Sequence, residues 1–402
     1  MTLLSSSPPP AAAAAQSTAG APPGGRLRRA GVFLLYNIAA VIFLLLLCEG
    51  AASVYFTFRE AFNHPDIAER LHTEYDPELG WINLPNVYLP NMYGPGKFLR
   101  TNSQRFRNNT DFSKVVPSGK SRIICSGDSF TLGFGVDNNH TWPSLLAAQA
   151  ANLESVNMGQ GGYGADQAYL WYKRDGVKLD HDMQIFAVIF PDIYRMQHSS
   201  FVGYGKPLLA LENGRLVIAN VPVPRTTATW SPRMERADNA FSNLSLTRLL
   251  HRAFKFGSSP FGAAAPSSGQ NQDTERVLSA ILDDLLAMNR AKNSVLVLAY
   301  LPTREELGVD TGASWRKFLA EYARQHQVLY VDLMDDFRHL RPAELDRLFI
   351  GGGDPDFLGA EGHYTEAGNE YVAGLIYRRL LANSETAAKL HFPTANGSGT
   401  GH

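Results

Sequence analysis

The sequence predicts an α/β domain in which helices cover both faces of a five-stranded, mostly parallel sheet. Three features lead to this prediction. Short apolar runs alternate along the chain with segments of helical periodicity, as in repeated β-α-β units. The run IFAVIF at 185–190 is apolar at every position, as expected of a central strand that is buried on both faces. The chain is also 45% hydrophobic, with 22 Phe, 16 Tyr and 5 Trp, which is enough apolar material for a large core.

The N-terminal segment is predicted to be a tail followed by a membrane anchor. Residues 1–29 consist mainly of Pro, Ala, Ser and Gly, and their only charges are three arginines. Such a stretch cannot bury enough apolar surface to offset its ordering entropy, so a disordered tail is predicted. Residues 30–48 carry no charged side chain. A helix of that length spans roughly 28 Å, close to the hydrocarbon thickness of a bilayer, so 30–56 is predicted to be a transmembrane anchor.

The apolar run at 30–48 could also be part of a cleaved signal peptide, and the charges before it predict how the protein is oriented in the membrane. Gly50-Ala51-Ala52 could serve as the cleavage site of a signal peptide. An uncleaved anchor is favoured because the leader is long and the apolar run exceeds the ~7–15 residues usual for a signal peptide. The arginines before the run predict a single-pass protein of the inner (plasma) membrane. Its N-terminus is expected in the cytoplasm and its C-terminal domain in the periplasm or outside the cell.

The rest of the chain divides by composition and turn signals. Residues 57–115 are predicted to form an irregular membrane-proximal segment with short strands. The α/β domain is expected over 116–385, with an insertion at 198–273, and a disordered tail over 386–402. Within the insertion, Asn213-Gly214 predicts a hairpin turn, since both residues accept positive φ. Residues 257–272 have the composition of a flexible linker.

The periodicity of the domain places its elements in order. Apolar runs of strand length and amphipathic runs of helix length follow one another along the chain. Strands are predicted at 122–125, 155–157, 185–190, 294–301 and 328–333, and helices at 142–152, 165–174, 274–290, 315–326 and 366–381.

Charge and cysteine content exclude several function classes. The chain has 37 basic and 38 acidic residues, a formal net charge of −1. This balance argues against nucleic acid as the main partner, because phosphate binding needs a basic face. Two cysteines exclude a disulfide scaffold and a four-thiolate zinc site. No metal or cofactor is predicted.

The first candidate loop is SGDSFT at 126–131, directly after the first strand. Ligands of open parallel sheets bind outside the carboxyl ends of the strands. A serine on a tight, glycine-containing turn at that edge offers a hydroxyl nucleophile beside backbone N–H donors, which acyl transfer requires. Ser129 is therefore a candidate nucleophile. The alternative is an ordinary turn in which Ser129 caps the following helix.

The second loop, NMGQGGYG at 157–164, follows the second strand and has four glycines in six residues. Gly159, Gly161 and Gly164 match the G-x-G-x-x-G dinucleotide fingerprint formally. That fingerprint expects an acidic residue about 20 residues later, whereas Asp192 comes 28 residues after Gly164. Nucleotide binding is therefore kept only as an alternative.

The third loop, EGHYTEAGN at 361–369, precedes the last helix. His363 is a candidate base, and Glu361 is the nearest acid that could orient its ring. Two other polar residues are expected to be structural: His140 at a loop or helix start, and Arg195 in a surface ion pair. Contact with an anionic group at the rim of the pocket is the alternative for Arg195.

In their order and spacing, the three loops resemble the conserved blocks of the SGNH hydrolases, also called GDSL-type esterases, over about residues 116–385. The resemblance implies a three-layer α/β/α fold of the flavodoxin-like kind and acyl-ester chemistry. It implies that Ser129 is the nucleophile, with its own N–H in the oxyanion hole. It also implies that Gly162 donates a second N–H to the oxyanion and that His363 is the catalytic base.

The third block of the family departs from the pattern in this chain. The family usually has an Asn that donates to the oxyanion, followed by Asp. Here the chain reads Pro191-Asp192, and proline has neither a side-chain donor nor an N–H. One oxyanion donor is therefore expected to be missing, while Asp192 remains the candidate third-block residue.

The acid of the family's triad usually stands three residues before the histidine, and Ala360 occupies that place. Glu361, two residues before the histidine, is the predicted substitute. Asp354, Asp356 or a Ser–His dyad without an acid are the alternatives.

The chain is accordingly expected to be a membrane-anchored, exoplasmic serine esterase or O-acyltransferase. Its expected substrates are acyl esters, such as those of a cell-surface polysaccharide, by analogy with the family. Hydrolysis and acyl transfer use the same residues, so both stay open. A catalytically weak or inactive protein of the same fold that binds glycan is the alternative function.

Overall fold

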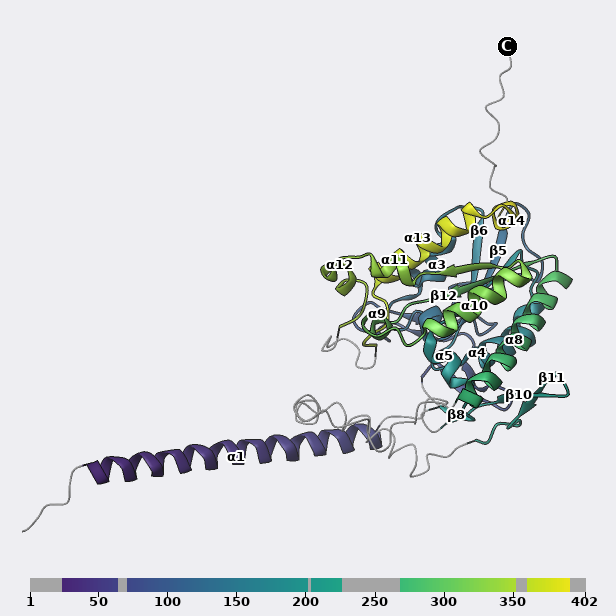
Figure 1. The fold of residues 1–402 in the computed structure, drawn as a ribbon. Coiled ribbons are helices and arrows are strands. Elements are labelled where there is room, and N and C mark those ends of the chain that lie inside the picture. The colour runs from purple at the N-terminus through teal and green to yellow at the C-terminus, as the bar shows by residue number, and fades with distance from the viewer. Residues whose placement is uncertain (1–23, 64–70, 202–203, 226–267, 352–359, 391–402) are drawn as a thin grey trace, which may run out of the picture.

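The computed structural model describes residues 24–63, 71–201, 204–225, 268–351 and 360–390 (Figure 1). At its centre lies a five-stranded sheet in which all neighbouring strands are parallel. The five predicted strands are confirmed, although the third ends at Val188, because Phe190 already begins a helix. In chain order the strands are β5 (Ser121–Gly127), β6 (Leu153–Gly159), β7 (Met183–Val188), β12 (Val295–Tyr300) and β13 (Leu329–Asp332).

The order of the strands determines where a ligand can bind. Across the sheet they lie in the order β13-β12-β7-β5-β6. Numbered along the chain this is 5-4-3-1-2, the flavodoxin-like order read from its other end. The winding reverses between β5 and β7, and doubly wound sheets bind ligands in the crevice outside the carboxyl ends of the strands at that point. The loop after β5 is therefore at the topological switch point.

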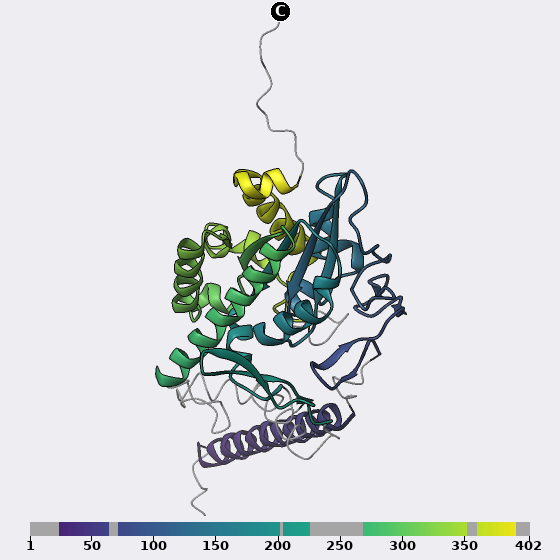
Figure 2. The ribbon, with the colours of Figure 1, turned by 90° about the vertical axis from the view of Figure 1, so that its right-hand side faces the viewer.

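Helices cover both faces of the sheet, which gives the three predicted layers (Figures 1 and 2). Alternate residues of each strand point to opposite faces. Ile124 of β5 thus packs in one core, with α4 (Ala165–Arg174), α8 (Ser268–Ala291) and α10 (Ala313–His326). Its neighbours Ile123 and Cys125 pack in the second core, with α3 (Trp142–Ala147) and α13 (Glu366–Ala382). All five predicted helices of the domain are present.

Several short helices have no counterpart in the sequence prediction. The most consequential for the boundaries is α14, because the chain was predicted to be disordered from residue 386. Asn383 caps α14 by accepting from the backbone N–H groups of Glu385 and Thr386, and Leu390 is buried. That prediction is wrong up to Leu390. The short helices are α2 (Ser129–Leu132), α5 (Phe190–Arg195), α9 (Arg304–Gly308), α11 (Met334–Arg338), α12 (Pro342–Asp346), α14 (Ser384–Lys389) and the 3-10 helices η2 (Asn138–His140) and η3 (Gly176–Lys178).

The segment that was predicted to be membrane-proximal and the insertion form small antiparallel pairs beside the domain. In the insertion the predicted hairpin is confirmed, with φ of 52° at Asn213 and 76° at Gly214. The predicted linker 257–272 is helical from Ser268 onward, and its earlier part lies outside the described residues. The strands are β1 (Thr73–Asp76), β2 (Gly80–Asn83), β3 (Tyr88–Leu89), β4 (Leu99–Arg100), β8 (Ser200–Phe201), β9 (Tyr204–Gly205), β10 (Leu208–Glu212) and β11 (Arg215–Ala219).

Helix α1 (Gly24–Asn63) contains the run that was predicted to be an anchor, and it lies outside the three layers in both views (Figures 1 and 2). The predicted tail is helical from Gly24, while residues 1–23 lie outside the described residues. Over the part of the chain that the structure describes, no helix satisfies both the length and the apolarity that a bilayer crossing demands. The transmembrane span predicted at 30–56 is therefore not supported by this structure.

Candidate active site

The candidate nucleophile lies on a tight turn at the end of β5. Asp128 caps α2 by accepting from the N–H of Phe130 at 2.8 Å, so the cap is Asp128 and the interpretation of Ser129 as the cap is wrong. Gly127 is required by packing, because a Cβ there would lie 2.6 Å from the carbonyl oxygen of Ala187. Ser129 is thus the first residue of α2, at the switch point of the sheet.

His363 reaches this serine from the loop before α13. Its Nε2 lies 2.9 Å from Oγ of Ser129, although the two residues are 234 positions apart. The rings of Phe130 and Phe134 flank the imidazole, with centroids at 4.8 and 5.1 Å. Burial lowers the pKa of His363 below its usual 6.5, against the opposing charge of Asp128. The ring is therefore neutral at pH 7 and able to accept the serine proton, as a general base must.

The far nitrogen of the imidazole faces the main chain. Nδ1 of His363 lies 3.2 Å from the carbonyl oxygen of Ala360, to which it donates as N–H. This bond selects the tautomer that leaves Nε2 as the acceptor for Ser129. Among the described residues, the carboxylate of Glu361 forms no hydrogen bond or ion pair with the ring, and the side chain is exposed. Asp354 and Asp356 lie outside the described residues. The described site is therefore a dyad that a backbone carbonyl orients.

The glycine loop packs directly against the nucleophile turn. Gln160 donates its backbone N–H to the carbonyl of Gly127, and a Cβ on Gly159 would lie 2.0 Å from the backbone nitrogen of Leu132. Gly162 has φ of +77°, and a Cβ there would lie 2.5 Å from the ring of Phe201. The structure thus brings the loop of Gly162 beside Ser129, as the predicted oxyanion hole requires, with Phe201 of the insertion covering the glycine.

Two of the three glycines of the formal dinucleotide fingerprint pack against protein. A Cβ on Gly159 would lie 2.0 Å from the backbone nitrogen of Leu132 in α2, and a Cβ on Gly164 would lie 2.5 Å from the Asp166 carboxylate, whereas a Cβ on Gly161 would meet open space. Asp166 is fully buried in the first turn of α4, where a phosphate would need positive potential. Close packing therefore accounts for Gly159 and Gly164, and the buried carboxylate of Asp166 disfavours a phosphate at the start of α4.

The third block contributes a carboxyl group and a cation that lie beside the nucleophile. Pro191 stands in the first turn of α5, and Asp192 accepts from the backbone N–H of Ile189 at 3.0 Å. Burial and the neighbouring charge of Asp128 raise the pKa of Asp192 well above its usual range. Arg195 lies 2.7 Å from Asp192 and its side chain is only 16% exposed. The expectation of a surface ion pair for Arg195 is therefore wrong.

The sequence assigned no role in the site to Asp128, and it placed Arg195 at the rim of the pocket only as an alternative. Asp128 was visible as the residue before the serine, but its contacts depend on the fold. Arg195 follows Asp192 by three positions, so both side chains lie on one face of α5. That spacing is the one local signal that could have connected Arg195 with the third block.

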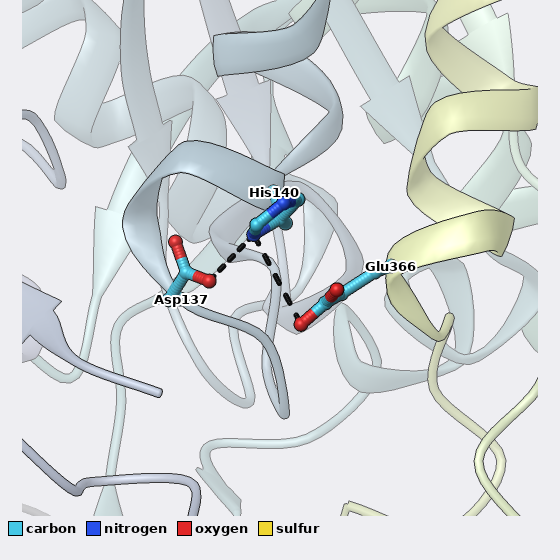
Figure 3. A group of neighbouring side chains, drawn as sticks. All are labelled: Asp137, His140 and Glu366. Carbon is cyan, nitrogen blue, oxygen red and sulfur yellow. Dashed lines mark hydrogen bonds and ion pairs between the residues drawn. The ribbon is translucent and has the colours of Figure 1, made fainter. Parts of the chain in front are cut away.

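One group in the described chain has the side chains to hold a metal ion: Asp137, His140 and Glu366 (Figure 3). Nδ1 of His140 lies 2.5 Å from Asp137 and 3.9 Å from Glu366. Although burial lowers the pKa of His140, its hydrogen bond to Asp137 raises that pKa overall. Asp137 also caps η2. The three residues thus already partner one another, and they link η2 to the first turn of α13, close to the loop of His363.

Comparisons with known proteins find similarity in structure only. No protein-family model matches the chain, and no curated protein matches it. Among solved structures, a lipolytic protein of the G-D-S-L family from Veillonella parvula is 14% identical, with a TM-score of 0.36 over 66% of this chain and 98% of that one. A mutant acetyl-xylooligosaccharide esterase from Geobacillus stearothermophilus is 12% identical, with a TM-score of 0.35 over 70% and 98%. Similarity at this level assigns neither a family nor an activity to this chain.

Proposed function

We propose that the chain is a serine esterase that cleaves acyl esters through an acyl-enzyme on Ser129. The observation that carries the proposal is the 2.9 Å contact between Oγ of Ser129 and Nε2 of His363 at the switch point of the sheet. A nucleophile and a base in hydrogen-bond contact are the minimum that acyl transfer requires. The resemblance of the three loops to the SGNH blocks supports the same reaction.

In the proposed reaction, Oγ of Ser129 attacks the ester carbonyl carbon while its proton passes to Nε2 of His363. The N–H groups of Ser129 and Gly162 stabilise the negative charge on the carbonyl oxygen. When the tetrahedral intermediate collapses, the bond to the alcohol breaks and His363 returns the proton to the leaving oxygen. Water, activated by the same histidine, then releases the acid. The Asp128 carboxylate stabilises the transient imidazolium by its charge, since it raises the proton affinity of His363.

The acceptor of the acyl group distinguishes an esterase from a transferase. A sugar hydroxyl can replace water in the second half of the reaction without any change in the catalytic residues. By analogy with the family, we propose acylated glycans as substrates, with transfer to a glycan hydroxyl as the related activity. The test is whether added oligosaccharide acquires the acyl group from a donor ester in competition with water.

The first test of the proposed function is labelling of Ser129. The full-length chain, purified in detergent, should hydrolyse p-nitrophenyl acetate and should be modified at Ser129 by a fluorophosphonate, as located by peptide mass spectrometry. Ser129→Ala should abolish both results, because the nucleophile is removed. Ser144→Ala is the matched control, since Ser144 lies on α3, outside the site, and it should behave as the wild type. An intact chain with neither turnover nor labelling would favour the glycan-binding alternative.

We further propose that the N-terminal helix anchors the enzyme with its α/β domain on the outer side of the inner membrane. Residues 30–48 have no charge, and apolar side chains of α1 such as Phe33, Phe43 and Leu47 are exposed, which is typical of a surface that contacts lipid or a partner. The expected result is that protease added to spheroplasts digests the α/β domain, while alkaline carbonate leaves the chain in the membrane fraction. A shielded domain would contradict the orientation. A mature N-terminus near Ala52 would show a cleaved signal peptide instead.

A further inference from the structure

The guanidinium of Arg195 lies where three segments of the site meet. Its Nη1 is 2.7 Å from Oδ1 of Asp192 on its own helix. The same nitrogen is 3.0 Å from the carbonyl oxygen of Tyr163, the residue after Gly162, and 3.4 Å from Oδ2 of Asp128 on the nucleophile turn. One side chain thus connects α5, the glycine loop and the turn of Ser129.

The glycine loop is also held from its other side. The guanidinium of Arg195 stacks over the ring of Phe201 at 4.9 Å, and this ring covers Gly162. The other neighbour of Phe201 is Trp81, which stacks with it at 6.3 Å and donates its indole N–H to the carbonyl of Gly161 at 2.9 Å. Loss of the Arg195 cation would therefore remove both a bond to the loop and a contact of the ring that covers it.

Arg195 also influences which acceptor the hydroxyl of Ser129 faces. Oγ of Ser129 lies 2.9 Å from Nε2 of His363, but 3.2 Å from Oδ2 of Asp128. Only the first of these hydrogen bonds prepares the serine for attack. The Arg195 cation draws on the same Oδ2, which weakens it as an acceptor for the serine hydroxyl.

We propose that Arg195 is a positioning residue of the active site, which holds the Gly162 loop against the nucleophile turn and directs the Ser129 hydroxyl toward His363. It would supply from α5 the link to the oxyanion side that the family's Asn would otherwise provide at Pro191. The proposal rests on the proposed esterase function, and it adds a residue that acts through Gly162 and Asp128 rather than on the substrate.

The test uses Arg195→Gln and Arg195→Lys in the full-length chain with p-nitrophenyl acetate. Loss of an oxyanion-hole group costs about 10²–10³ in rate elsewhere. Arg195→Gln should lower kcat by about 10²-fold. KM should change by about threefold at most, because Arg195 does not contact the substrate. Arg195→Lys should recover part of this loss, since it keeps the charge but lacks the planar guanidinium that stacks over the ring of Phe201.

The pH profile separates positioning from general support of the fold. The charged groups that face His363 are Asp128 from the nucleophile turn and Arg195 from α5, alongside the carbonyls of Ala360 and Glu361. The positive charge of Arg195 lowers the pKa of His363. Arg195→Gln should therefore move the acid limb of kcat/KM to higher pH, whereas Arg195→Lys should leave that limb in place.

Arg174→Gln is the matched control. Arg174 also pairs with several carboxylates, Asp76, Glu78 and Asp175, but at the far end of α4 from the glycine loop. It should retain the wild-type kcat and pH profile. A wild type without turnover or Ser129 labelling would refute the proposed function itself. If the wild type is active and Arg195→Gln has the same kcat and pH profile as Arg174→Gln, the role of Arg195 is overturned while the proposed function stands. If circular dichroism shows that Arg195→Gln does not fold, a wild-type kcat in Arg195→Lys overturns the role of Arg195.

Discussion

Replacing His363 with alanine is expected to lower kcat for p-nitrophenyl acetate by about 10³–10⁴-fold, and adding Ser129→Ala should cause little further loss. Members of one catalytic unit are not additive, because removal of the base already leaves the nucleophile inactive. The 2.9 Å contact between the two side chains is the arrangement that such a unit requires. Single-turnover and steady-state rates of the two single variants and of the double variant measure this directly. Losses that multiply in the double variant would contradict the dyad.

Two further measurements on the same site sharpen this expectation. Glu361→Gln tests the acid that was predicted from the sequence, and activity should stay within about threefold of wild type, because surface substitutions of this kind are usually mild. Because burial lowers the pKa of His363, the wild-type acid limb should have its midpoint below pH 6.5, with activity lost as pH falls through that value. A midpoint above 6.5, or a Glu361→Gln variant as inactive as His363→Ala, would indicate an acid on Nδ1.

Replacing Lys206 with methionine is expected to lower the free energy of unfolding by about 3–5 kcal/mol, the usual cost of removing one partner from a buried ion pair. Lys206 and Asp166 are both 0% exposed, and Nζ lies 2.5 Å from the carboxylate. Nζ also donates to the carbonyls of His198 and Pro207. Burial raises the pKa of Asp166 even beside this lysine, so without it the carboxylate would be strongly destabilised.

The free energy of unfolding of each variant is measured by chemical denaturation, followed by tryptophan fluorescence. The variants are compared at a constant dependence of that free energy on denaturant concentration, the m-value. The double variant Lys206→Met/Asp166→Asn should regain much of the loss, since it leaves no unpaired charge. Arg324→Gln is the matched control, because the Arg324–Glu321 pair is exposed and should contribute almost nothing. A Lys206→Met midpoint equal to that of Arg324→Gln would contradict the expected role of the pair. Lys206 lies just before β10 in the insertion, and Asp166 lies in the first turn of α4, directly after the glycine loop. The ion pair therefore joins the insertion to the segment that follows the glycine loop.

The strands and the positions of Ser129 and His363 could be predicted because their signals are local. A run such as IFAVIF, apolar at successive positions, is typical of a strand that is buried on both faces, and a serine directly after the first strand of a parallel sheet comes to the edge where ligands bind. The spacing of Ser129 and His363 gave no distance, but it placed both at the same edge, where the structure brings them into contact.

The features that could not be predicted depend on pairing between distant segments. In the sequence, Arg195 has the pattern of an ordinary arginine on the surface of a helix. Its contacts with Tyr163 and Asp128, which lie 32 and 67 positions away, exist only in the folded chain. Glu361 was chosen because it was the nearest acid, but the turn of the loop directs a main-chain oxygen to the ring instead. The helix α14 was overlooked because its cap and its buried Leu390 stabilise a segment whose composition resembles a tail.

The carbonyl that orients His363 has a consequence for how this site can change over generations. A single substitution can remove a carboxylate partner, whereas a main-chain oxygen is present whatever residue occupies position 360. A substitution can displace this oxygen only by changing the backbone conformation of the turn. Gly362 has φ of +80°, a conformation that residues with a side chain rarely adopt. Substitutions of Glu361 should therefore be tolerated, while Gly362 should be invariant among active enzymes that share this site.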